Sequence, residues 1–518
     1  MKNKKLKYRL VLRTDYADGF RKNIFLNKSD TSKKDELTLR YKLNWDFNET
    51  TDINFIISKV DMDDPADIWT IDGSLNTLSD RPGMDSQETN SYGIKITKNF
   101  INFDLQSFTS STKTDVIFSY DADWGNPDSH FPYIYDYFSE TLRKRDTFSQ
   151  EIRILSKNTD FSQKKPFEWV FGMDFSELEE TNVTRDDGIY GDPSDPYGPY
   201  ASESVISRNY KAENFSLFGN IDYFLTKNYK LAIGLRWENW DSKYNDSNQE
   251  SFNPSDNMNG GKISLIKNNE SSNIYLSIAK GYKQGGFNIG LDATDSSIKD
   301  SLIYDPEFLI NYEIGVNSNG NDTNLNYSAV IFFSKREDQQ VLISKQIDPT
   351  DPNTFSYLTQ NAAEGENYGL EISSNYFVSD NLNLFANFGF LKTKIKNWES
   401  RIDLEDRAQA HAPEKTYSVG MNYDLKNNFY LKFDINGKSS FYYSDSHDNK
   451  SQSYQLININ FGYSKDNISA ELWIRNALDK YYSTRGFYFG NEAPNFEDTL
   501  YRRQGDPKNL GLSLRYNF

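Results

Sequence analysis

Hydrophobic and polar residues alternate with a period of two along much of this chain. The last nine residues show the pattern most clearly: one parity carries Leu510, Leu512, Leu514, Tyr516 and Phe518, and the other carries Gly511, Ser513, Arg515 and Asn517. Such alternation predicts a β-strand with one apolar and one polar face. The strand ends on the aromatic Phe518, which is typical of outer-membrane β-barrels whose outer face meets lipid. For this segment alone, a buried terminal strand of a globular protein is the alternative.

The same alternation recurs in many earlier segments, for example residues 37–47, 325–333 and 429–436. In the last of these, Lys432 and Asp434 occupy the polar parity, where they would be costly in a protein core but not in a wet lumen. The pattern predicts about 20 strands, with no linker or low-complexity block between them. We therefore expect a single all-β domain over residues 1–518, built as a large antiparallel transmembrane β-barrel.

The segments that connect the predicted strands alternate in length. Tight connectors, rich in residues that tolerate turn dihedrals, are found at 48–52, 226–228, 319–322, 379–381, 426–428 and 465–467. Long polar connectors include 61–90, 121–143, 177–206, 245–259 and 337–366. Short periplasmic turns at one rim and long extracellular loops at the other are the arrangement of transmembrane β-barrels. A soluble β-propeller would repeat one blade length, and no such period is found.

Composition narrows the class of protein further. Only 37% of residues are hydrophobic, yet 15% are aromatic, a mixture that suits a polar lumen with aromatic girdles at the membrane surfaces. No run approaches the roughly 18 to 20 apolar residues of a membrane helix. The absence of cysteine excludes a disulfide scaffold or thiolate metal site. The net charge of -17 argues against a nucleic-acid partner.

Two C-terminal motifs carry a family resemblance. The sequence IRNALDKYY at 474–482 and the sequence GDPK at 505–508, followed by the terminal strand, resemble the last two strands of the TonB-dependent receptor family. Ala477 and Lys508 depart from the usual residues. Shorter matches occur in family order at 234–237, 279–288, 306–307, 312–315, 367–371 and 412–414. The chain is therefore similar to the β-barrel portion of this family over nearly its full length.

The resemblance implies a location, a set of partners and a missing part. Family members are outer-membrane barrels of 22 strands, filled by an N-terminal plug and preceded by a signal peptide and a TonB-binding segment. No such signal, plug or segment is found in this sequence, so we expect a truncated gene, a split gene or a miscalled start codon. The expected partners are outer-membrane lipid, the barrel assembly machinery, and TonB with its inner-membrane partners if a plug is supplied. We expect a monomer.

The terminal strand has two possible fates if the first hairpin is absent. Residues 510–518 either close against residues 6–16 in a smaller barrel, or they leave an unpaired edge that lipid would not tolerate. Without a plug, the chain as written is expected to form an open pore or no stable product, and no coupled uptake.

By family resemblance, the expected function is uptake of a large scarce nutrient, with an iron–siderophore or similar iron chelate as the ligand. Iron is the family's commonest substrate, so the choice rests on association. A passive porin-like channel and a receptor for glycans or another non-iron ligand are the alternatives, and a soluble all-β propeller is a third.

No catalytic constellation is found, so we predict neither an enzyme nor a cofactor or metal site. His130, His411 and His447 lie far apart in sequence, and no hydrolase elbow, phosphate loop or zinc-binding helix motif is present. The acidic loops around 187–195 and 295–305 are spaced unlike an EF-hand, which favours solvated charge over weak calcium binding.

The candidate ligand contacts are aromatic residues of the long loops, because flat rings with polar neighbours suit bulky chelates or sugars. They are Trp124, Tyr133, Tyr135, Tyr190, Tyr197, Tyr200, Tyr488 and Phe489. The alternative is that these residues pack the loops together or belong to the outer girdle. On the inner parity of two strands, Glu313 and Glu371 are expected to face the lumen and to pair with Arg or Lys across the wall.

Overall fold

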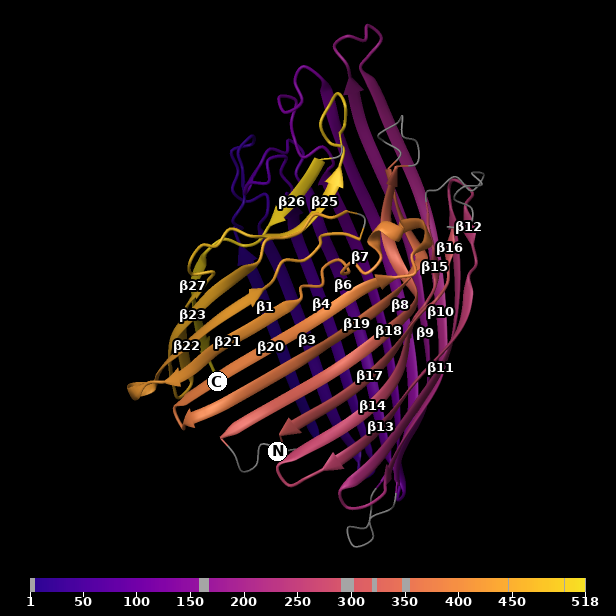
Figure 1. The fold of residues 1–518 in the computed structure, drawn as a ribbon, viewed down its shortest axis with the longest axis vertical. Coiled ribbons are helices and arrows are strands. Elements are labelled where there is room, and N and C mark those ends of the chain that lie inside the picture. The colour runs from indigo at the N-terminus through magenta and orange to yellow at the C-terminus, as the bar shows by residue number, and fades with distance from the viewer. Residues whose placement is uncertain are drawn as a thin grey trace.

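The wall of the molecule is one large curved antiparallel sheet (Figure 1). The computed structural model describes residues 5–157, 167–289, 302–318, 324–346, 355–445, 447–497 and 499–517. Within these ranges the sheet has 21 strands, of which β12 (Ser251–Phe252) has only two residues. The predicted all-β fold and the count of about 20 long strands are therefore confirmed.

Consecutive long strands of the chain pair with each other, always antiparallel. In chain order they are β1 (Leu6–Ala17), β3 (Lys34–Asn48), β4 (Thr51–Ala66), β6 (Gly83–Asn99), β7 (Phe103–Asp121), β8 (Ile134–Ser156), β9 (Phe167–Gly191), β10 (Tyr200–Phe224), β11 (Tyr229–Asp246), β13 (Ser255–Asn268), β14 (Ser272–Lys283), β17 (Glu307–Ser318), β18 (Leu325–Gln346), β19 (Phe355–Ser379), β20 (Leu382–Lys396), β21 (Lys415–Asp424), β22 (Phe429–Lys438), β23 (Tyr454–Lys465), β24 (Ile468–Arg475) and β27 (Asn509–Tyr516).

The two faces of this sheet differ as the alternation predicts. On β11, Ile233, Leu235 and Trp237 are exposed, while Arg236 between them forms ion pairs on the opposite face. Charged side chains such as Arg236 lie on the concave face, where an apolar core would make them costly. The apolar face is therefore the outer one, which faces lipid. No helix in the described ranges is long and apolar enough to span a lipid bilayer.

The tight turns lie where the sequence predicts them, but the long loops are shorter than predicted. Strands meet across Glu49–Thr50, Asp380–Asn381 and Asp466–Asn467, and the predicted turn at 319–322 lies outside the described residues. The segment 177–206, predicted as a loop, is mostly strand, because β9 and β10 leave only 192–199 between them. Beyond the membrane both faces of these strands are wet, so no hydrophobic alternation marks them.

Aromatic rings cover glycines on neighbouring strands and thereby bring the strands into close contact. A Cβ added at Gly462 would meet the ring of Tyr430, and one added at Gly511 would meet the ring of Trp473. A side chain at either glycine would displace the ring that fills the space. These pairs fix the register of the sheet from side to side.

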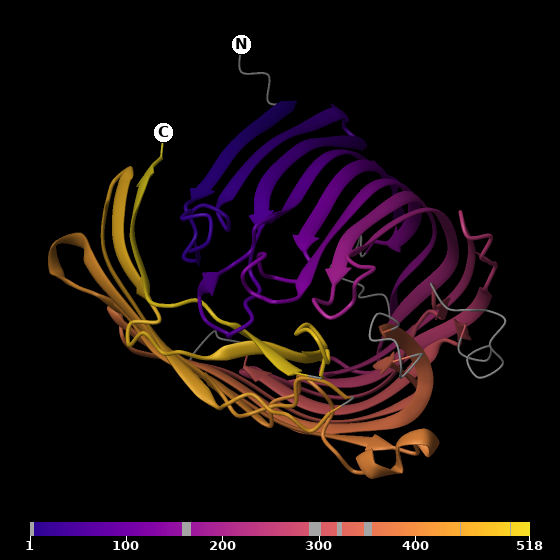
Figure 2. The same cartoon turned by 90° about the horizontal axis from the view of Figure 1, so that it is seen from above.

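The two edges of the sheet do not pair with each other in the described residues. Strand β1 pairs only with β3, and β27 pairs only with β24. Figure 2 shows the two edge strands separated by a gap, seen from above. Of the two fates predicted for the terminal strand, the structure has the unpaired edge, with Leu510, Leu512, Leu514 and Tyr516 exposed on the outer face. Phe518 lies outside the described residues.

Among the described connecting segments there are three two-stranded sheets: β2 (Lys22–Asn23) with β5 (Asn76–Thr77), β15 (Gly286–Phe287) with β16 (Ile303–Tyr304), and β25 (Ser483–Phe489) with β26 (Thr499–Gln504). Seen from above, β25 and β26 and the connecting segments of the first strands project over the opening of the wall (Figure 2). We call this region, made of residues 18–33, 67–82, 121–137, 190–200, 476–497 and 499–508, the mouth.

Candidate functional site

An aromatic cluster holds the mouth together. The indole ring of Trp124 lies 5.6 Å from that of Trp69, and its centroid is 4.8 Å from the ring of Tyr501 and 5.9 Å from that of Phe489. Only 7% of the Trp124 surface is exposed. Two of the predicted ligand contacts, Trp124 and Phe489, therefore pack loops that are distant in sequence, with Trp69 and Tyr501 as partners that the sequence analysis missed.

Three predicted tyrosines form a row across adjacent strands. Tyr135 on β8 lies opposite Tyr190 on β9, which in turn lies opposite Tyr200 on β10. The rings of Tyr135 and Tyr190 both pack on Phe496, at 5.1 and 5.7 Å between centroids. Burial raises the pKa of the Tyr135 phenol above its ordinary value. Exposure increases along the row, from 8% for Tyr135 to 53% for Tyr200.

The most exposed candidate is Tyr197, in the short connection between β9 and β10. Its side chain is 85% exposed, and the neighbouring Tyr200 donates its hydroxyl hydrogen bond to Asp195 at 2.9 Å. Tyr133 is half-buried, and Phe131 beside it is 81% exposed. These side chains, rather than the buried ones, present aromatic surface to a molecule that enters the mouth.

Tyr488 lies apart from this cluster. Its hydroxyl accepts a hydrogen bond from Asn449 at 2.6 Å, and its ring packs on His447 with 4.8 Å between centroids. The structure thus brings Trp124, Tyr135, Tyr190 and Phe489 into one packed network, whereas Tyr488, although it precedes Phe489 on β25, contacts the connection between β22 and β23.

Buried polar groups support the aromatic cluster. The carboxylate of Asp121 accepts hydrogen bonds from the Ser79 hydroxyl at 2.5 Å and from the Trp124 amide at 3.0 Å. Burial and the neighbouring carboxylate of Asp123 raise the pKa of Asp121 to about 8. Asp123 accepts from the amide of Tyr137 at 2.9 Å. A network of this kind fixes loop geometry because each buried acceptor has a donor.

The mouth also links the N-terminal and C-terminal parts of the chain. Asn491 donates its amide to the Asp123 carbonyl at 2.7 Å, and the Tyr481 hydroxyl donates to the carbonyl of Gly73 at 2.6 Å. A third bond runs from Arg21 to the carbonyl of Gln504 at 3.3 Å. The two edge strands are thus held near each other by loop contacts although their backbones do not pair.

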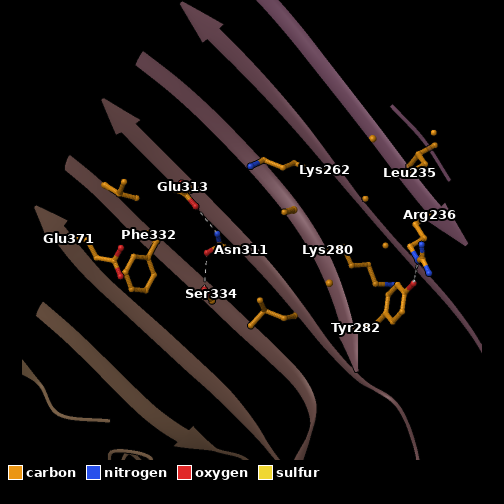
Figure 3. A pocket seen from close by; sticks show the side chains of 18 residues that line it. Leu235, Arg236, Lys262, Lys280, Tyr282, Asn311, Glu313, Phe332, Ser334 and Glu371 are labelled. Carbon is orange, nitrogen blue, oxygen red and sulfur yellow. Dashed lines mark hydrogen bonds between the residues drawn. The ribbon is translucent and has the colours of Figure 1, made fainter. Parts of the chain in front are cut away.

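Below the mouth, the inner wall carries a cavity of about 910 Å³. Figure 3 shows the polar side chains around it, which come from strands β11 to β19. Arg236 forms an ion pair with Glu238 at 2.7 Å and with Asp174 at 3.1 Å, and Tyr282 donates to Glu238 at 3.0 Å. Both carboxylates are paired with the same guanidinium, and Tyr282 adds a neutral donor, so this wall presents a connected polar network.

The predicted partners of Glu313 and Glu371 are wrong. Glu313 lines the cavity, as expected, but accepts hydrogen bonds from Tyr275 and from Asn311, the latter at 3.1 Å (Figure 3). In the described ranges neither carboxylate has an Arg or Lys nitrogen within 4 Å. For Glu313, neutral donors, one on the adjacent strand β14 and one on β17 itself, take the place of the expected cation, and the wet lumen removes the need for charge pairing.

The family-like motifs occupy positions of architectural importance. Asn476 is buried and donates its amide to the carbonyls of Lys480 and Asp506, which ties the connection after β24 to the start of β27. Glu307 is buried beside Arg336, with 2.6 Å between the charged atoms. Both sets of contacts favour an architectural role for these motifs over a role in ligand contact.

Acidic residues near the mouth have protein partners. Asp187 accepts from Arg81 at 2.6 Å and Asp192 accepts from Ser194 at 2.7 Å. Among the residues that the structure describes, no group of three or more His, Cys, Asp or Glu side chains is placed to hold a metal ion. The acidic residues of the second loop, Asp295 and Asp300, lie outside the described residues.

Comparison with known proteins identifies the family of most of the wall. The family model described as TonB dependent receptor-like, beta-barrel, matches residues 9–477. A curated relative is the probable TonB-dependent siderophore receptor PiuA of Acinetobacter baumannii, 29% identical over 192 residues. That alignment covers 36% of this chain and 24% of the receptor, so most of the receptor's length lies outside it.

Solved structures match the fold over essentially the full chain. The ferric yersiniabactin uptake receptor FyuA of Yersinia pestis has a TM-score of 0.79 at 15% identity, covering 100% of this chain and 76% of that one. The siderophore receptor PiuA of Acinetobacter baumannii has a TM-score of 0.74 at 16% identity, covering 99% and 78%. The copper transporter OprC has a TM-score of 0.71 at 14% identity, covering 100% and 76%. At such identities the match establishes the fold alone.

Proposed function

Because this chain belongs to the TonB dependent receptor-like β-barrel family, we propose that it is the barrel of a receptor that imports an iron chelate. Barrels of this family lie in the bacterial outer membrane and are transporters rather than enzymes, and this chain is such an outer-membrane barrel. We propose further that residues 1–518 act as one domain, and that transport depends on TonB acting through a plug.

The observation that carries the choice of ligand is the sequence similarity to a siderophore receptor over 192 residues. Two of the structures with the same fold are also named as receptors for siderophores or ferric chelates. The copper transporter shares the fold as well, so the fold alone does not select the ligand.

In this proposal the exposed tyrosines at the mouth make the first contact with ligand. Tyr197, Tyr200 and the half-buried Tyr133 supply aromatic surface, and the buried Trp124 and Tyr135 hold the loops around them. Rings of this kind bind flat, partly apolar faces, which ferric chelates of aromatic siderophores present. Tyr488 and Phe489 would then contribute to the support of the loops.

The test measures binding of ferric and iron-free siderophores to the chain folded into lipid vesicles, by quenching of tryptophan fluorescence. We expect saturable quenching by at least one ferric chelate. Binding should be roughly 30-fold weaker after Tyr197→Ala with Tyr200→Ala, because each of the two lost ring contacts is worth of the order of 1 kcal/mol. Tyr8→Ala on the outer face is the matched control and should leave binding unchanged. Equal binding by both variants would refute the mouth as the site.

The passive channel makes a different prediction. In a planar bilayer, a porin-like chain conducts ions with no effect of any chelate, whereas a receptor barrel shows conductance that its ligand reduces. Conductance together with no binding of any ferric chelate would favour the channel over the receptor.

A further inference from the structure

The outer face of the wall carries an aromatic girdle. On strands β8, β9, β10, β18, β20 and β21, the next outward-facing residue toward the mouth is charged, and the sign of this charge differs between the two sides of the molecule. On β8, β9 and β10 the rings are Phe148, Phe175 and Phe215, and the next outward residues are Asp146, Glu177 and Glu213. On β18, β20 and β21 the rings are Phe333, Phe390 and Tyr417, and the next outward residues are Lys335, Lys392 and Lys415. Between them, β19 places Glu366 beyond Tyr368.

Most of these charges have a partner of opposite sign. Lys211 lies 2.8 Å from Glu177 and 3.2 Å from Glu213. Lys335 lies 3.4 Å from both Glu337 and Glu364. The lysine on β18 is therefore already engaged by carboxylates.

Lys392 and Lys415 differ from these groups. Both are exposed, and in the described part of the chain neither ammonium group has a carboxylate within 4 Å. Lys415 lies directly opposite Phe390, the girdle ring that precedes Lys392 by two residues. The two lysines are therefore diagonal neighbours, about 7 to 8 Å apart at their Cα atoms, with flexible side chains that can converge.

We propose that Lys392 and Lys415 form a binding site for a phosphomonoester-bearing lipid of the outer leaflet. The position of the two lysines relative to the membrane supports a lipid as the ligand, because the first polar position beyond an aromatic girdle lies at the level of lipid headgroups. The apolar face below, formed by Phe388, Phe390 and Val419, accommodates the acyl chains. Two ammonium groups match the two negative charges of a phosphomonoester, and Lys394, already 3.1 Å from Asp406, borders the site.

The test uses the full chain in mixed micelles that contain phosphatidylcholine and phosphatidic acid, with native mass spectrometry to count retained phosphatidic acid. We expect the Lys392→Gln, Lys415→Gln double variant to bind this lipid about 25-fold more weakly, from roughly fivefold per lysine. The double variant with arginine at both positions should retain binding. Phosphatidylcholine should not be retained by any variant.

The matched control is the double variant Lys59→Gln, Lys113→Gln, which removes two outward lysines on the other side that already have carboxylate partners at 2.9 and 3.6 Å. It should bind phosphatidic acid as the unmodified chain does. Equal loss in both double variants would show a response to overall charge and overturn the site. Retention in the Lys392, Lys415 glutamine variant, or displacement of the lipid by inorganic phosphate at equal concentration, would overturn it as well.

Discussion

In the membrane-spanning wall, outward side chains are aliphatic or aromatic and inward ones are polar. At the mouth, a cluster of aromatic rings around Trp124 is buried, with hydrogen-bonded polar groups beside it. Leu235 on the wall is largely exposed on its outer face, while Trp124 at the mouth is almost fully covered. The wall depends on lipid to cover its apolar face, and the mouth depends on its own loops. The difference predicts that substitutions in the two regions destabilise different parts of the molecule.

The largest effect is expected from Trp124→Ala. Removing an indole that contacts four other rings leaves a cavity, which typically costs about 3 to 5 kcal/mol. Because these contacts lie outside the sheet, hydrogen exchange should increase at the mouth and stay unchanged in β17 to β24. Trp45→Ala on the outer face serves as the control, and an unchanged exchange rate at the mouth in Trp124→Ala would contradict the packed cluster.

A smaller effect, confined to the wall, is expected from Gly462→Ala. The new methyl group would meet the Tyr430 ring and displace it, at a cost of about 1 to 3 kcal/mol. Gly281→Ala is the matched control, because no atom lies within 4 Å of its added methyl group. Unfolding by urea from lipid vesicles measures both, and equal midpoints for the two variants would show that ring-on-glycine contacts do not stabilise the sheet.

The smallest effect at neutral pH is expected from Asp121→Asn. The pKa of Asp121 is raised by burial to about 8, so its folded form binds a proton that the unfolded form releases above about pH 4. This contribution to stability is present at low pH and decreases as pH rises through this window. The amide keeps the acceptor oxygen and cannot ionise.

The near-ultraviolet circular dichroism of the aromatic cluster measures this difference during thermal unfolding. The unmodified chain should lose stability as pH increases from about 5 to about 9, relative to the Asn variant, which should show a flatter profile. Parallel profiles would show that Asp121 is already ionised in the folded mouth.

The wall was predictable from sequence because each transmembrane strand carries its own alternation. Residues 37–47 and 510–516 show it without knowledge of any partner strand. The strand extensions of β9 and β10 were missed because both of their faces are wet. The partners of Glu313 were missed for another reason. They are a Tyr on a neighbouring strand and an Asn on its own strand, and nothing in the sequence pattern distinguishes these two from the many other polar residues.

The mouth was predictable only in composition. Aromatic-rich loops indicated Trp124, Tyr135 and Tyr190, but nothing in the sequence places Asn491 against Asp123 or Tyr481 against Gly73. Such contacts join residues hundreds of positions apart, and they depend on the curvature that the whole sheet acquires. The exposure of each aromatic residue likewise depends on how the loops pack together, so the sequence alone did not predict it.

The most direct test of the lipid-facing wall uses the absence of cysteine from the chain, which allows single cysteines to be placed along β20. With the protein folded in lipid vesicles, a water-soluble maleimide should label cysteines at the inward positions Asn383 and Asn387. It should not label those at the outward positions Leu384, Ala386 and Phe388. Equal labelling at both parities, or faster labelling at the outward positions, would contradict an apolar outer face embedded in lipid.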